Sequence, residues 1–249
     1  MDDLLYGIHP VYEALVAGRR KFEELYISKG RRIKGIQPLL ERARADGIPI
    51  QYRGPDYFES LLGRSVHQGV AAQVGDFPLV YEGTILKKAE TDRELPLILA
   101  LDGIVDPQNL GSLIRTGLAM GIHGVILARD RSAPLSPSVS KASAGAMEHA
   151  LIARVPNLVA ALKSVKKAGL WVVGAHVGSQ QRVDEADFNV GLVLVVGGES
   201  KGIRPLVQKT CDYLVSVPQK GALDSLNAAV AGAMVMYEVV RQRMKDAHS

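Results

Sequence analysis

The stretch LVLVVGGESKG, residues 192–202, decides the fold of this 249-residue chain. Its first half is a continuous apolar run rich in β-branched residues, which is typical of a parallel strand covered on both faces. Gly197 and Gly198 then allow the backbone to turn sharply or to approach a ligand closely. Ligands of open α/β sheets bind beyond the carboxyl ends of the strands, so we expect Gly198, Glu199 and Ser200 to lie in a functional loop.

Length and composition indicate a soluble globular protein with room for one large domain or two ordinary ones. No run of residues approaches the roughly 20 apolar residues of a membrane-spanning helix. The start, MDDLLYGIHP, has acidic residues where a signal peptide has basic ones. The single cysteine, Cys211, excludes an intrachain disulfide and a thiolate zinc site. We therefore expect a cytoplasmic protein without a bound metal or a membrane partner.

Strand and helix patterns alternate along the chain, which predicts an α/β fold with a parallel sheet. We expect a small N-terminal α/β domain at residues 1–77 and a larger domain at residues 97–249. A polar segment bracketed by two prolines, residues 78–96, is expected to link them. Basic residues gather between positions 19 and 34. That gathering indicates either a solvated face or a patch that contacts the phosphates of RNA or DNA.

Two familiar motifs fit the 192–202 stretch poorly. A phosphate-binding P-loop would need Lys and Ser or Thr where Ile203 and Arg204 stand. The segment GESKG also matches the nucleophile turn of serine hydrolases, with Ser200 as the nucleophile. In those hydrolases the catalytic histidine follows the nucleophile along the chain. Of the six histidines here, only His248, the penultimate residue, follows Ser200, and a chain end is a poor place for a general base. Serine hydrolysis therefore stays a distant alternative.

Polar residues follow three of the expected strands, and together they carry a resemblance to a known family. The segments are DGIVDPQNLGSLIRTGLAMG at 102–121, LVLVVGGESKGI at 192–203 and VSVPQKGALDSLNAAVAGAMVMYE at 215–238. They resemble, in order, the three motifs of the SpoU-type RNA ribose 2′-O-methyltransferases of the α/β-knot superfamily. The first domain, ending in HQGVAAQV at 67–74, is similar to the substrate-binding domain of that family.

The resemblance implies a fold and a cofactor that periodicity alone does not predict. The larger domain is expected to be a parallel-sheet α/β-knot with a deep trefoil knot, and the smaller one to bind RNA. The methyl donor is expected to be S-adenosylmethionine. By resemblance, its site includes Gly197, Gly198, Val217, Pro218, Ser225 and Leu226.

The resemblance also implies the catalytic residues, which are Arg115, Asn109, Glu199, Ser225 and Asn227. Arg115 is the central one, proposed in the family to activate the ribose hydroxyl. A guanidinium stays protonated at neutral pH, so we expect it to stabilise the developing alkoxide electrostatically rather than to act as a base. Asn109, Ser225 and Asn227 could instead simply cap helices. Glu199 could likewise bind helix amides.

The expected partners are ribosomal RNA and a second copy of the chain, bound through the knotted domain. The activity implied is 2′-O-methylation of a guanosine ribose in large-subunit ribosomal RNA. A transfer RNA substrate and a non-catalytic RNA-binding protein remain alternatives. The residues expected to contact RNA are Arg19, Arg20, Lys21, Arg31, Arg32, Arg129 and Arg131.

Overall fold

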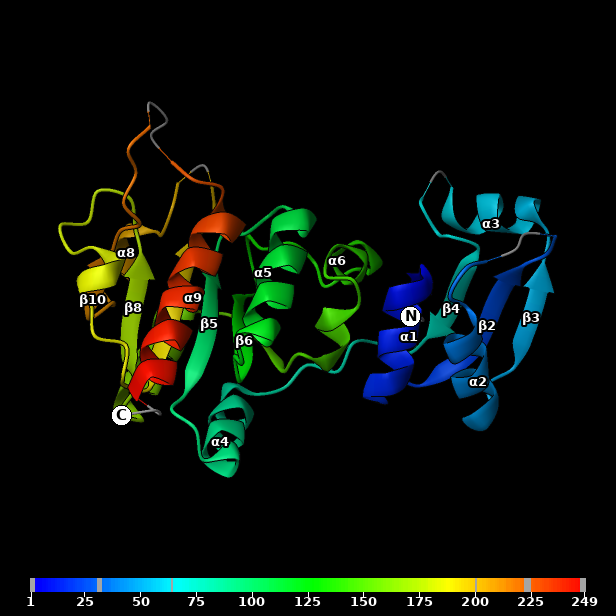
Figure 1. The fold of residues 1–249 in the computed structure, drawn as a ribbon, viewed down its shortest axis with the longest axis horizontal. Helices are drawn as coiled ribbons and strands as arrows, with labels where there is room; N and C mark the ends of the chain where they lie inside the picture. The colour runs from blue at the N-terminus through cyan, green and yellow to red at the C-terminus, as the bar shows by residue number, and fades with distance from the viewer. Residues whose placement is uncertain (1–2, 31–32, 64, 200, 222–224, 247–249) are drawn as a thin grey trace. The chain divides into compact units, whose positions relative to one another are not determined.

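The computed structural model describes residues 3–30, 33–63, 65–199, 201–221 and 225–246. These residues form two compact units. The first comprises residues 1–78 and 134–149, and the second comprises residues 79–133 and 150–249. Each unit has a sheet of its own (Figure 1). Within the described ranges, no helix has the length and apolar character needed to cross a membrane.

The first unit is a four-stranded mixed sheet with helices packed on it. The strand order is β1-β4-β2-β3, with β2 and β3 parallel and the other two pairs antiparallel. Its main core packs α1 and α2 on one face of the sheet. The elements are β1 (Asp3–Tyr6), α1 (Ile8–Ala17), β2 (Phe22–Ser28), α2 (Gln37–Ala45), β3 (Ile50–Arg53), α3 (Pro55–Leu62), β4 (Val70–Val74), α6 (Pro137–Ala142) and the 3₁₀ helix η1 (Ala146–His149).

Residues 134–149 belong to the first unit although they lie deep in the sequence of the expected larger domain. A buried ion pair holds them there: Glu148 lies 3.5 Å from a guanidinium nitrogen of Arg20 and accepts a 2.8 Å hydrogen bond from Ser140. Gly145 is required at its position because a Cβ there would stand 2.6 Å from that of Glu13. The boundary expected at residue 97 places this segment in the larger domain, whereas its contacts are with the first unit.

The second unit is a six-stranded sheet in which every neighbouring pair is parallel, in the order β10-β8-β9-β5-β6-β7. This architecture confirms the predicted parallel α/β fold. The elements are α4 (Glu82–Asp92), β5 (Leu97–Asp102), α5 (Pro107–Ala119), β6 (Gly124–Ala128), β7 (Ile152–Val155), α7 (Leu158–Lys167), β8 (Trp171–Ala175), the 3₁₀ helix η2 (Val183–Glu185), β9 (Leu192–Gly197), α8 (Pro205–Gln208), β10 (Tyr213–Val215) and α9 (Ala228–Asp246).

Helices cover both faces of this sheet, which explains why β5, β6 and β9 are apolar along their length (Figure 1). One face carries α4, α7 and α8, whose Ile85, Leu162 and Val207 share a core cluster. The other carries α5 and α9, which pack together so closely that a Cβ on Gly232 would lie 2.6 Å from Leu113. The segment expected as a linker thus contains α4, whose Ile85 is fully buried.

The strand order reverses between β5 and β9. From β5 the chain runs outward to β6 and β7, whereas β9 lies on the other side of β5, next to β8. The helix that follows β5 lies on one face of the sheet and the helix that follows β9 lies on the opposite face. Such a topological switch point opens a crevice at the carboxyl ends of the two strands, which is where ligands bind in open α/β sheets.

Candidate active site

The loops that follow β5 and β9 are packed backbone against backbone. The Gly198 N–H donates to the carbonyl oxygen of Asp102 at 3.0 Å, and the Gly202 N–H donates to that of Gly198 at 2.8 Å. A Cβ on Gly198 would lie 2.2 Å from the oxygen of Gly103, and one on Gly197 would lie 2.1 Å from the carbonyl carbon of Gly202. Both glycines are therefore needed for the close approach of the chain to itself.

Three polar side chains meet at this switch point. Asn109, in the first turn of α5, donates its amide to Glu199 Oε1 at 2.9 Å. Asn227 donates its own amide to the Asn109 side-chain oxygen at 2.8 Å and to the same Glu199 oxygen. The cluster joins residues 118 positions apart in the sequence. The structure therefore brings together three of the five residues expected to be catalytic.

Asn227 is also the cap of α9, and this fixes how its amide is oriented. Its side-chain oxygen accepts hydrogen bonds from the backbone N–H groups of Ala229 at 2.9 Å and Val230 at 3.2 Å. Because those groups can only donate, the NH₂ of Asn227 must face Glu199. Capping and a place in the cluster are thus combined in one residue. Asn109, by contrast, does not cap α5, since Asp106 accepts the hydrogen bond from the Gln108 N–H.

Glu199 presents an acceptor at the edge of this cluster. Both amides donate to Oε1, and Oε2 accepts no hydrogen bond from the part of the chain that the structure describes. The side chain of Glu199 is exposed while Asn109 is only 8% exposed. The carboxylate is therefore held in place through Oε1, while Oε2 is available to a ligand. A hydroxyl group arriving from solvent could donate to Oε2.

Asp102 and Arg204 form a supporting ion pair that the sequence did not reveal. Asp102 ends β5 and is 1% exposed. Its carboxylate accepts from the Arg204 Nε at 2.7 Å and from the Arg204 backbone N–H at 2.8 Å. Its carbonyl holds the Gly198 N–H. Asp102 therefore fixes both ends of the loop that carries Glu199; a charged residue ending an otherwise apolar strand was the available signal.

Arg115 and Ser225 do not join the cluster within one chain. Arg115 lies six residues after Asn109 on α5, which places it about 120° around the helix from Asn109. Its side chain is exposed, and neither it nor that of Ser225 makes a hydrogen bond or ion pair with a residue that the structure describes. Ser200, the hydrolase candidate, lies outside the described residues.

A small cavity lies beside the cluster, at the ends of β8 and β10. Val217 and Leu226, two of the residues expected to hold the cofactor, line it together with Val215, His176 and Gln219. Its free volume is about 50 Å³. Apolar walls with polar groups at the edge suit an adenine ring. The other four expected residues, Gly197, Gly198, Pro218 and Ser225, do not line this cavity.

The residues expected to contact RNA are divided between the two units. In the first unit, Arg20 is 7% exposed and donates to the carbonyl of Gly75 besides pairing with Glu148, so it is a correction to the expected surface patch. Arg19 is half-buried and donates to the backbone carbonyls of Glu148 and Pro78. Lys21 is exposed.

Arg31 and Arg32 of the same patch lie outside the described residues. In the second unit, just after β6, the Nε of Arg129 lies 3.7 Å from the Oδ1 of Asp130. Arg131 adopts a left-handed conformation with φ of 61°. For a residue with a Cβ, that conformation costs roughly 1–2 kcal/mol.

Metal and thiol chemistry find no support among the described side chains. No group of three or more His, Cys, Asp or Glu residues with metal-binding geometry occurs in the described ranges. Burial raises the pKa of the Cys211 thiol to about 12, so this residue is not a thiolate nucleophile.

Comparison with known proteins identifies the family. A model of the SpoU rRNA methylase family matches residues 96–237, and a model of the RNA 2′-O ribose methyltransferase substrate-binding domain matches residues 4–79. The 23S rRNA (guanosine-2′-O-)-methyltransferase RlmB of Yersinia pestis is 36% identical over 243 residues, which cover 98% of each chain. RlmB of Escherichia coli strain K12 is 35% identical, over 98% of this chain and 100% of the relative.

The solved structures agree with these relatives. The SpoU methyltransferase AviRb from Streptomyces viridochromogenes, crystallised in complex with the cofactor AdoMet, superposes with a TM-score of 0.82. It is 27% identical to this chain, and the superposition covers 98% of this chain and 91% of AviRb. Sequence and architecture thus match over both units, and this chain belongs to the SpoU rRNA methylase family of RNA 2′-O-ribose methyltransferases.

Proposed function

We propose that this protein transfers the methyl group of S-adenosylmethionine to the 2′-hydroxyl of a guanosine ribose in large-subunit ribosomal RNA. The observation that carries the proposal is the cluster of Asn109, Glu199 and Asn227 at the switch point of the parallel sheet. The nucleotide and the RNA class are inferred from the RlmB relatives, which align over 98% of this chain.

The cofactor supplies a methyl group that is already activated on a sulfonium. Val217 and Leu226 would form the apolar slot, and the backbone around Gly197, Gly198, Pro218 and Ser225 would complete the site. The cavity of about 50 Å³ is much smaller than typical ligand pockets, so it would hold only a part of the cofactor.

The polar cluster would position the ribose. Glu199 Oε2 would accept the hydrogen bond of the 2′-hydroxyl and take up its proton as the methyl group is transferred, and the two amides on Oε1 keep the carboxylate from rotating. Ser225, two residues before Asn227, supplies a hydroxyl at the same edge. Arg115 stabilises the developing alkoxide with its permanent charge. Arg129, Arg131 and Lys21 contribute to holding the RNA backbone.

Arg115 would reach the ribose from a second copy of the chain. Within one chain it points away from Asn109, as described above. The neighbouring helix α9 exposes an apolar stripe at heptad spacing, formed by Val230, Met234, Tyr237 and Met244. Four exposed apolar residues along one helix face are typical of a surface that another chain covers.

Mixing two inactive variants tests this shared site. Arg115→Ala and Glu199→Gln should each abolish methyl transfer, and a mixture refolded together should regain part of the activity, because mixed dimers contain one intact site. A mixture as inactive as either parent would contradict the shared site.

The trefoil knot implied by the resemblance is also proposed for this chain. The chain leaves β10 at one edge of the sheet and returns as α9, which packs on β8 and β9. On the way, Ser216 bonds to the 179–183 loop, donating its N–H to the Gln181 carbonyl at 2.9 Å and accepting from the Val183 N–H at 2.9 Å. A crystal structure in which residues 216–227 pass outside the loop between β8 and β9 would contradict the knot.

Mapping of ribose methylation tests the proposed activity and its substrate together. Unmodified large-subunit ribosomal RNA and transfer RNA are incubated separately with the protein and S-adenosylmethionine, and 2′-O-methylated positions are read by alkaline-hydrolysis sequencing. We expect one new guanosine site in the ribosomal RNA. Methylation confined to transfer RNA would contradict ribosomal RNA as the substrate and identify transfer RNA instead. No methylation of either RNA would contradict the activity.

A further inference from the structure

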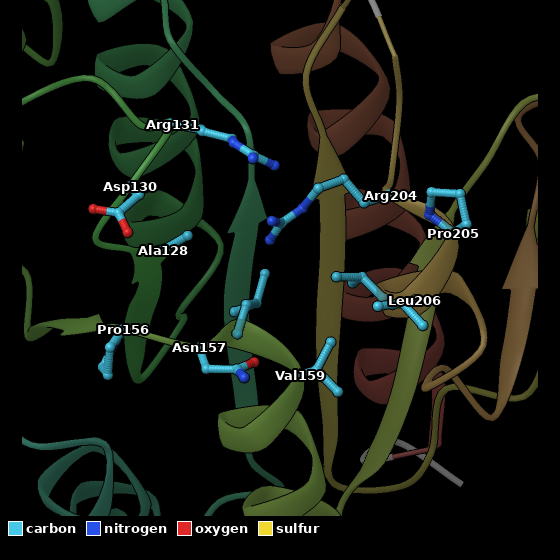
Figure 2. A pocket seen from close by; sticks show the side chains of 11 residues that line it. Ala128, Asp130, Arg131, Pro156, Asn157, Val159, Arg204, Pro205 and Leu206 are labelled. Atoms are coloured by element: carbon cyan, nitrogen blue, oxygen red, sulfur yellow. The ribbon is translucent and has the colours of Figure 1, made fainter.

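A second, larger cavity opens at the carboxyl edge of the sheet, outside the cofactor and ribose sites. It has a volume of about 620 Å³ and lies where β6 and β7 end and where α7 and α8 begin (Figure 2). All of its lining residues belong to the second unit. The volume falls in the range of pockets that take nucleotide-sized ligands.

Two guanidinium groups face each other across this cavity. Figure 2 shows the side chains of Arg131 and Arg204 pointing toward one another, while the carboxylate of Asp130 is turned away from them. Arg131 makes no ion pair or hydrogen bond with any residue in the described ranges. Asp102 binds only the Nε and the backbone N–H of Arg204, which leaves its two terminal nitrogens without a bond to a described residue. Like charges converging in this way favour an anion between them.

The backbone conformation of Arg131 supports a role in ligand binding. Its backbone has a φ of 61°, which an L-residue adopts at a cost, and its side chain lines the cavity. Strained conformations of this kind gather at ligand sites. Arg204 is equally fixed, because its partner Asp102 is fully buried.

Apolar residues make up most of the remaining cavity wall, with Asn157 and Asp130 as its other polar members. Pro156, Leu158, Val159 and Leu206 line it, and Leu206 is 70% exposed at the mouth. A flat aromatic base can stack against such a wall while its phosphate binds the arginines. The pairing of two guanidinium groups with an apolar wall thus fits a nucleotide better than a free inorganic anion.

We propose that this cavity binds one nucleotide of the RNA strand, with its phosphate between Arg131 and Arg204 and its base against Val159 and Leu206. The inference rests on the proposed RNA methyltransferase function. Asp102 links the two sites, because it holds Arg204 at the cavity and the Gly198 N–H beside Glu199. RNA bound in the cavity would therefore be registered against the loop that positions the target ribose.

Arg131→Ala tests the phosphate contact, with Arg93→Ala as the matched control. Both variants lose one exposed arginine of the second unit that has a left-handed backbone conformation, but only Arg131 lines the cavity. For Arg131→Ala we expect the KM for the ribosomal RNA substrate to rise about tenfold or more, as for a lost charge-assisted hydrogen bond. The affinity for S-adenosylmethionine and kcat should stay unchanged. Arg93→Ala should stay within about twofold of wild type. An equal rise of this KM in the two variants would overturn the proposed nucleotide site in the cavity.

Leu206→Asp tests the apolar wall, with Leu79→Asp as its control on the same unit. Leu206→Asp should weaken RNA binding in a filter assay at least as much as Arg131→Ala, whereas Leu79→Asp, at a 49% exposed leucine, should have little effect. Equal effects of the two would overturn the assignment of the wall. Circular dichroism confirms that each variant is folded.

Direct binding separates this inference from the proposed activity. A wild-type protein that binds RNA through Arg131 but methylates none would contradict the activity and support the cavity. If wild type methylates RNA and the Arg131→Ala variant binds RNA as tightly as wild type, the activity would be supported and the nucleotide site in the cavity would be contradicted. Guanosine monophosphate is titrated in parallel as a probe: weaker, Arg131-dependent binding supports an RNA nucleotide, and tighter binding than RNA would overturn the strand as the source.

Discussion

Replacement of Asn227 by Asp separates the structural part of this residue from its part in the active site. The Asn227 oxygen caps α9, and Asp caps helices as well as Asn does. The Asn227 NH₂ donates to Glu199 and Asn109, and Asp has no such donor. The variant Asn227→Asp therefore keeps α9 intact and turns two attractive contacts into repulsive ones. Asn227→Ala loses both the cap and the donors.

The contacts give the expected sizes of these effects. Loss of the cap in Asn227→Ala should cost about 1 kcal/mol of unfolding free energy. In Asn227→Asp, two ionised carboxylates about 3–4 Å apart repel by roughly 1–4 kcal/mol, for an effective dielectric constant between about 80 and 20. The repulsion is relieved when the pair takes up a proton, so the penalty is present at high pH and is lost as the pH falls.

Two measurements test the prediction. Trp171, the single tryptophan, lies at the start of β8 and reports unfolding of the second unit alone by its fluorescence in urea. Single-turnover methyl transfer at pH 6 and pH 9 reports the site. We expect Asn227→Asp to approach wild-type stability and activity at low pH and to lose both at high pH.

Asn157 gives the control for helix capping. It caps α7 by accepting from the Ala160 N–H, and it has no carboxylate partner in the described residues. Asn157→Asp should therefore show no such pH dependence in the urea experiment. An Asn227→Asp variant that matches wild type at pH 9 would refute the proposed cluster.

Three further predictions concern the loop, the inserted segment and the interface. Gly198→Ala should abolish methyl transfer because its Cβ would lie 2.2 Å from a backbone oxygen, whereas Gly83→Ala, with open space, should be neutral or stabilising by up to about 1 kcal/mol. Burial raises the pKa of Glu148, so its stabilising effect falls as the pH rises through that pKa. Hydrogen exchange of residues 134–149 should therefore show wild type losing protection relative to Glu148→Gln between pH 5 and pH 8; parallel profiles would contradict this. Tyr237→Glu, at the exposed face of α9, should shift sedimentation toward monomer, and Leu61→Glu should not; unchanged sedimentation of Tyr237→Glu would argue against that interface.

The burial of Arg20 shows where local sequence stops being informative. Arg20 stands in a run of basic residues, and charge clustering predicts a solvated or RNA-facing side chain. Its partner Glu148 is 128 positions away and brings the 134–149 segment into the first unit. No periodicity within either stretch encodes that pairing. The helix α4 was hidden for a similar reason, because only Ile85 and Ala89 of its eleven residues are buried.

The sequence by itself determined the parallel α/β architecture and the family. Continuous apolar strands such as residues 192–196, and three motifs in order, are local features that the chain carries whether or not it is folded. The sequence also named Asn109, Glu199 and Asn227 as members of one site. It could not show that the three bond to one another, because the motifs lie far apart along the chain.

Only the tertiary structure decided what the residues in and around those motifs do. Packing of the loops after β5 and β9 made Gly197 and Gly198 necessary for contact between backbones, and it made Asp102 the support of the Glu199 loop. It also aimed Arg131 and Arg204 into one cavity while leaving Arg115 exposed and apart from Asn109. The physical reason is that contact between side chains depends on distance and direction in space, and these are fixed by the strand order and the faces of the helices rather than by spacing in the sequence.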